Sequence, residues 1–137
     1  MIPASWALQQ AVYAALSADS TLCGLIGSPP RLYDAVPRSV VFPYLVLAED
    51  VETAWDSASD SGSQHKLVLH AFSRGSGRKE IKRITAALCA ALPDTALTLS
   101  GHHLVNWSFT AADFSRESDG RTYRATVTFR AVTEPTF

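Results

Sequence analysis

Alternating and periodic apolar residues predict a strand, a turn and a helix in the middle of the chain. Residues 66–72 read Lys-Leu-Val-Leu-His-Ala-Phe and are apolar on both alternating faces, which is typical of a buried strand. Residues 73–77 predict a turn in which Ser76 caps the next helix, and Pro93 ends that helix. The apolar side chains of this helix recur with the spacing of one helical face: Ile81, Ile84, Leu88 and Leu92.

The N-terminal half predicts another helix and another strand. Residues 3–18 predict a helix with one apolar stripe, and residues 19–27 predict a short helical turn. Four prolines make residues 29–43 irregular. Residues 44–51 then read as a strand that is apolar on both faces in its first half.

Residues 55–63 are polar and predict an overlong tip for the hairpin that joins the strands 44–51 and 66–72. Such a tip is either a tolerated surface loop without a function or an arm that contacts a partner. In the second case Asp56 and Asp60 are candidates for docking that partner. Few apolar anchors lie in residues 56–64, so we expect this segment to be mobile in a free subunit.

The C-terminal third predicts a hairpin with one buried and one wet face. Apolar residues alternate along 105–111 and again along 123–131, with Asp119-Gly120 at the turn. The pattern places Phe109 and Phe129 in the layer that Leu88 contacts, and residues 96–99 predict a short strand before the hairpin.

Together these elements predict an α+β fold, with a mainly antiparallel sheet of about four strands, two helices packed on one side, and a single domain over residues 1–137. Two helices cover only one face of the sheet. The second apolar face of the hairpin 44–72 therefore needs the proline-rich segment or another subunit to cover it.

Composition narrows the function classes. An apolar fraction of 47% and a charged fraction of 18% are typical of a globular protein. The net charge of −1 gives no overall attraction to nucleic acid or to an anionic membrane, and no stretch has the roughly 20 apolar residues of a membrane span. Cys23 and Cys89 lie far apart and predict reduced thiols, as in a cytoplasm.

The four histidines do not predict a metal centre. Their spacing matches no zinc signature, and we expect His65, His102 and His103 at the surface and His70 in the sheet. A small metal-binding or hydrolytic domain built on His70 with Glu49 is an alternative from another class. We expect no catalytic residue and no cofactor.

One charge cluster opposes local stability. It lies at the start of the second main helix and consists of Arg78, Lys79, Lys82 and Arg83. Cations there face the positive end of the helix dipole, at roughly 0.3–1 kcal/mol each. The cluster is either a docking patch for an acidic partner or a solvated face stabilised by Glu49, Asp50 or Glu52. No aromatic residues are interleaved for base stacking, which favours a protein partner over nucleic acid.

Several short motifs occur in a familiar order. They are Phe-Pro-Tyr-Leu-Val-Leu at 42–47, His-Ala-Phe-Ser at 70–73, Ala-Ala-Leu-Pro at 90–93, Asp-Gly-Arg-Thr-Tyr-Arg-Ala at 119–125 and Phe-Arg-Ala at 129–131. In this order the chain resembles the tail completion or tail terminator family of long-tailed phages and phage-derived gene transfer agents.

The resemblance implies a small α+β subunit without catalytic residues. It implies a hexameric ring of identical subunits that caps the tail tube, halts tube polymerisation and offers a surface to the head connector. The implied partners are the tail tube protein and the head–tail connector or adaptor, with DNA only as cargo and no membrane. Such a protein is in the host cytoplasm during assembly and then at the top of the tail. A head–tail adaptor or a tail tube subunit is the alternative within the same setting.

Overall fold

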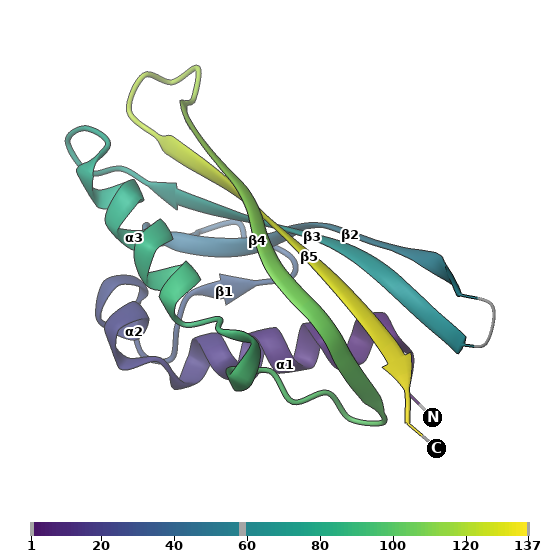
Figure 1. The fold of residues 1–137 in the computed structure, drawn as a ribbon. Coiled ribbons are helices and arrows are strands. Elements are labelled where there is room, and N and C mark those ends of the chain that lie inside the picture. Colours follow the sequence, from purple (N-terminus) through teal and green to yellow (C-terminus); the bar gives the residue numbers. More distant parts are fainter. Residues whose placement is uncertain (1, 58–59, 137) are drawn as a thin grey trace.

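The computed structural model describes residues 2–57 and 60–136, in which five strands form one sheet and three α-helices pack on one of its faces (Figure 1). The elements are, in order, α1 (Ala4–Ala18), α2 (Ser20–Ile26), β1 (Leu32–Tyr33), β2 (Tyr44–Ser57), β3 (Asp60–Ser73), α3 (Lys79–Ala90), the 3-10 turn η1 (Asp94–Ala96), β4 (His102–Arg116) and β5 (Tyr123–Pro135). The strand order is β1-β2-β3-β5-β4. Only β1 pairs in parallel in the described part of the chain, so the predicted α+β class is confirmed.

The element count is larger than predicted. In the segment expected to be irregular, Leu32–Tyr33 pairs in parallel with Leu45 and Val46 and adds the fifth strand. A third α-helix forms because the Asp19 carboxylate accepts a hydrogen bond from the backbone N–H of Leu22 at 2.9 Å and caps α2. The strand predicted at 96–99 is wrong. The chain makes the turn η1 there, and buried side chains at 97 and 99 hold the following segment against the core.

The hairpin β2–β3 is far longer than predicted. The two strands pair as far as Ser57 with Asp60, and the ribbon extends past α1 (Figure 1). The prediction of a polar loop over 55–63 is therefore wrong for the residues described. Strand β5 supports the ribbon from Ser63 inward, and Gly62 allows a close approach, since a Cβ there would lie 3.0 Å from the carbonyl oxygen of Thr133.

The core lies between the helices and one face of the sheet. Leu88 is completely buried and Phe129 is 1% exposed, which confirms the predicted contact layer. The ring of Trp107 stacks on Phe129 with centroids 4.8 Å apart. Phe109 also contacts Phe129, at 6.1 Å, yet it stays 52% exposed. The predicted burial pattern of 105–111 is confirmed for Trp107, which packs against the core, and is wrong for the exposed Val105. Bulges at 104/106 and 109/111 break the two-residue period of edge strand β4.

The proline-rich segment partly covers the opposite face of the sheet. This was one of the two covers expected from the sequence, the other being a second subunit. Tyr44 stacks on Phe72 with centroids 5.1 Å apart, and Phe42 packs edge-on against Tyr44 at the same distance. The Arg74 guanidinium lies 4.1 Å from the centre of the Phe42 ring. This aromatic group covers only the Tyr44 end of the face. No described helix has the length and apolar character of a membrane span.

Candidate docking surface

The basic cluster begins at the turn from β3 into α3. The helix starts at Lys79, and Arg78 precedes it without a side-chain cap, so the prediction that Ser76 caps the helix is wrong. Ser73, the last residue of β3, organises the turn instead. Its hydroxyl donates a hydrogen bond to the Glu80 carboxylate and accepts one from the backbone N–H of Gly75 at 3.2 Å. Glu80 thereby brings one anion to the positive end of the helix.

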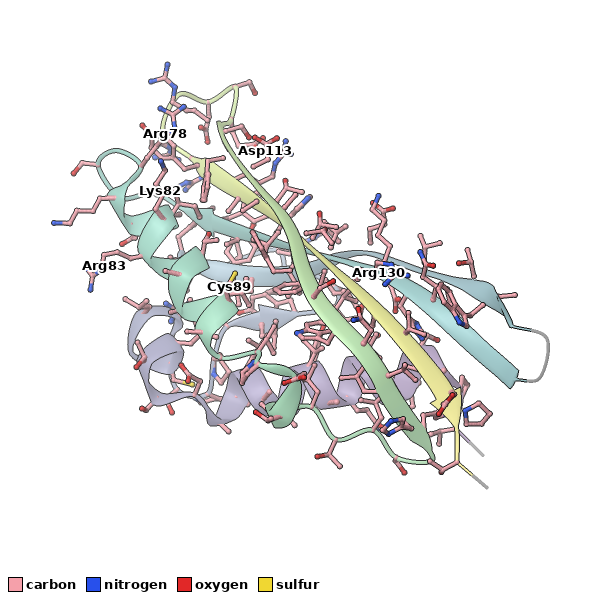
Figure 2. The ribbon with its side chains drawn as sticks, viewed as in Figure 1. Arg78, Lys82, Arg83, Cys89, Asp113 and Arg130 are labelled. Carbon is pink, nitrogen blue, oxygen red and sulfur yellow. The ribbon has the colours of Figure 1, made fainter. Side chains whose placement is uncertain are left out.

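Two of the four cations lie over aromatic rings of the hairpin β4–β5. The Arg78 guanidinium lies 5.7 Å from the Tyr123 ring centre, and the Lys82 ammonium lies 5.2 Å from the Phe114 ring centre. Figure 2 shows Arg78, Lys82 and Arg83 together at the end of the molecule where β4 turns into β5. Exposed cation–π contacts are worth about 0.5–1 kcal/mol each, which offsets the unfavourable helix dipole at these two positions.

None of the four cations makes an ion pair with any residue that the structure describes. The three ion pairs found there lie elsewhere, and one of them joins Glu49 to Lys66 at 3.3 Å. The expectation that Glu49, Asp50 or Glu52 stabilises the cluster is therefore wrong. These acids lie on β2, which two strands separate from β4.

The acids form a separate negative surface along β2. Glu49, Asp50 and Glu52 are exposed and nearly consecutive. Partial burial raises the pKa of Asp50, and the neighbouring charges of Glu52 and Asp34 raise it further. The sheet thus carries positive charge beside β4 at the start of α3 and negative charge along β2.

Asp56 and Asp60, the acidic docking candidates, lie near the tip of the hairpin β2–β3. Their backbones pair with Ser61 and Ser57 respectively. Their side chains fall outside the part of the molecule that the structure describes. A docking role for them stays a prediction.

The histidines do not form a catalytic or metal site in the described residues. In the ladder His70 lies opposite Val46 and Glu49 lies opposite Val68. The Glu49 carboxylate forms its ion pair with Lys66, so no described contact joins His70 to Glu49 as that alternative requires. No group of three metal-ligating side chains occurs in residues 2–57 and 60–136.

His65 is the largest departure from the expected histidine positions. It is completely buried, and its Nε2 lies 2.9 Å from the Thr133 hydroxyl. The surface position expected for it is wrong because the ladder continues beyond it and turns this residue towards the core. An unbroken two-residue period extended back from 67 through 65 was the signal that could have found it.

Burial of His65 predicts a stability that falls in mild acid. Burial lowers the pKa of His65 below its usual 6.5; Glu52 opposes this effect and His102 adds to it. As the pH drops, the unfolded chain therefore binds a proton before the folded chain does. The free energy of unfolding keeps its full value above pH 6.5 and decreases as the pH drops below 6.5. For one group this decrease is at most about 1.4 kcal/mol per pH unit. Burial also lowers the pKa of His70, which contributes in the same window.

Urea unfolding between pH 7.5 and 5 measures this slope. The variant His65→Gln should flatten it, while His103→Gln, at an exposed position, should leave it unchanged. An equal slope in both variants would contradict the buried neutral state of His65.

The comparisons with known proteins agree with this geometry. The tail completion protein gp17 family matches residues 10–134. A chain of the virion of a native gene transfer agent particle is similar, with a TM-score of 0.86, 30% identity, and 98% of this chain and 99% of that chain covered. The bacteriophage SPP1 gp17 protein has the same fold, with a TM-score of 0.65, 22% identity, and 93% and 89% covered. No curated protein matches the chain.

These findings confirm the resemblance that the short motifs indicated. The chain therefore belongs to the tail completion protein gp17 family, whose members are structural and not enzymatic.

Proposed function

We propose that this protein caps the tail tube of a phage or phage-like particle as a ring of six identical subunits. The ring ends tube polymerisation and provides the surface on which the head connector docks. The observation that carries the proposal is the likeness to a gene transfer agent virion chain, which extends over nearly the full length of both chains. Assembly takes place in the host cytoplasm, and the finished ring stays at the top of the tail, with DNA passing through it.

The charge distribution supports assembly with protein partners. The start of α3 presents cations without described ion-pair partners, and β2 presents exposed acids. We assign Arg78, Lys79, Lys82 and Arg83 to the docking of an acidic surface on a neighbouring subunit, the tube or the connector. We also assign Asp56 and Asp60, near the tip of the hairpin β2–β3, to the docking of a partner. Complementary charge of this kind directs association and sets its orientation.

Imaging of particles made without the protein tests this function. Loss of a terminator should leave tails that are overlong as well as not joined to heads, and resupply of the wild-type chain should restore one tail length. Tails of normal length without heads would indicate an adaptor. Absence of tubes would indicate a tube subunit.

A further inference from the structure

The sheet has two long open edges. Strand β4, 15 residues long, pairs only with β5 in the described part of the chain. At the other side, β1 covers β2 only at Leu45 and Val46. In the described residues, no strand therefore pairs with this side of β2 from Leu47 to Ser57, and we call this part its open edge. Open edges leave backbone N–H and C=O groups free to pair with another strand.

The edge strands also carry much of the exposed apolar surface. Seven large apolar side chains are exposed in the described residues, and four of these lie on β2 or β4: Val51, Trp55, Val105 and Phe109. Natural edge strands are commonly blocked by lysine or proline. Strand β4 contains neither, and its charged residues Asp113 and Arg116 lie towards its C-terminal end, so that in the described structure its bulges are the blocking feature along residues 104–111.

Direction and charge select which edges meet. Successive pairs β2–β3, β3–β5 and β5–β4 are all antiparallel, so β4 runs opposite to β2. A rotation about an axis along the strands therefore brings β4 of one copy antiparallel to β2 of the next. Pairing of β2 with β2 would oppose the acids Glu49, Asp50 and Glu52. Pairing of β4 with β4 would close a dimer and end growth.

We propose that copies of this chain join edge to edge, with β4 of one subunit adding antiparallel to the open part of β2 of the next. One sheet then runs through all subunits of the ring. This inference rests on the proposed function and names the interface that builds the ring. At equal height along the ladder, the acids of β2 then lie beside residues 107–111 of the neighbouring β4, which carry no negative charge.

Lysine substitutions on each edge test the interface in particles from cells that lack the wild-type chain. Val105→Lys blocks β4, Val51→Lys blocks β2, and Val36→Lys is the matched control. The three valines are 51%, 41% and 44% exposed, and Val36 lies outside both edges. Each purified variant is first checked for a folded state by thermal unfolding. Copies per particle are then counted by quantitative mass spectrometry.

Both edge variants should fall at least about tenfold below wild type in copies per particle, while Val36→Lys should match it. Normal incorporation of both edge variants, beside a wild-type chain present in several copies, would overturn edge pairing and leave the ring proposal standing. Loss with Val105→Lys alone would overturn the head-to-tail arrangement. A wild-type chain present as one copy per particle would overturn the ring itself.

Discussion

Replacement of Leu88 by alanine is expected to lower the free energy of unfolding by about 2–5 kcal/mol. Leu88 lies on α3, is completely buried, and belongs to the core cluster that joins α3 to the sheet. Removing its side-chain atoms loses their transfer free energy and leaves a cavity that the surrounding helices and strands close only in part. Denaturant unfolding followed by circular dichroism measures the change.

An exposed position on the same helix supplies the control for this prediction. Arg83→Ala keeps good helix propensity and removes no buried atoms, so it should change the free energy of unfolding by no more than about 0.5 kcal/mol. A loss below 1 kcal/mol for Leu88→Ala would contradict the assigned contact between α3 and the sheet.

Reversal of charge at Lys79 and Arg83 is expected to weaken assembly without weakening the fold. These two exposed cations have no aromatic ring beneath them, unlike Arg78 and Lys82, so their replacement by glutamate breaks no described contact of that kind. Glutamate suits a helix N-terminus, so the stability of the subunit should stay constant or rise slightly. Joining of heads to tails should fall roughly tenfold at low salt, since each rim pair is worth up to about 1 kcal/mol.

The readout is the yield of joined particles at low and at physiological salt. The wild-type yield should itself fall as salt rises, because salt screens exposed charge pairs. A control with Arg38→Glu, compared with the single variant Arg83→Glu, makes the same change in net charge at an exposed site outside α3 and the β4–β5 hairpin. Unchanged assembly by the Lys79→Glu, Arg83→Glu variant at both salt concentrations would contradict a docking role and show that these cations form a solvated face only.

Elements with a strong period were predictable from the sequence. The face of α3 with Ile81, Ile84 and Leu88 is buried as its spacing indicated, and the inward residues of β5 from Ala125 to Ala131 are buried in alternation. Both elements face the core along their whole length. In such elements burial alone decides which positions are apolar, so the spacing of apolar residues in the sequence reveals the buried face.

Elements that depend on neighbouring strands were not predictable in the same way. The polar residues of the β2–β3 ribbon form strands because the ladder continues through them, and His65 is buried because β5 lies beside it. The bulges of β4 are decided by its pairing with β5. The basic cluster was identified from sequence, but its aromatic partners Phe114 and Tyr123 lie more than 30 residues away along the chain.

Reconstruction of the intact particle by electron cryomicroscopy tests the central claim most directly. The account predicts one ring of six copies of this fold at the head-proximal end of the tail tube, between the last tube ring and the connector. Density for the fold that repeats along the tube, or that lies only within the connector, would contradict it.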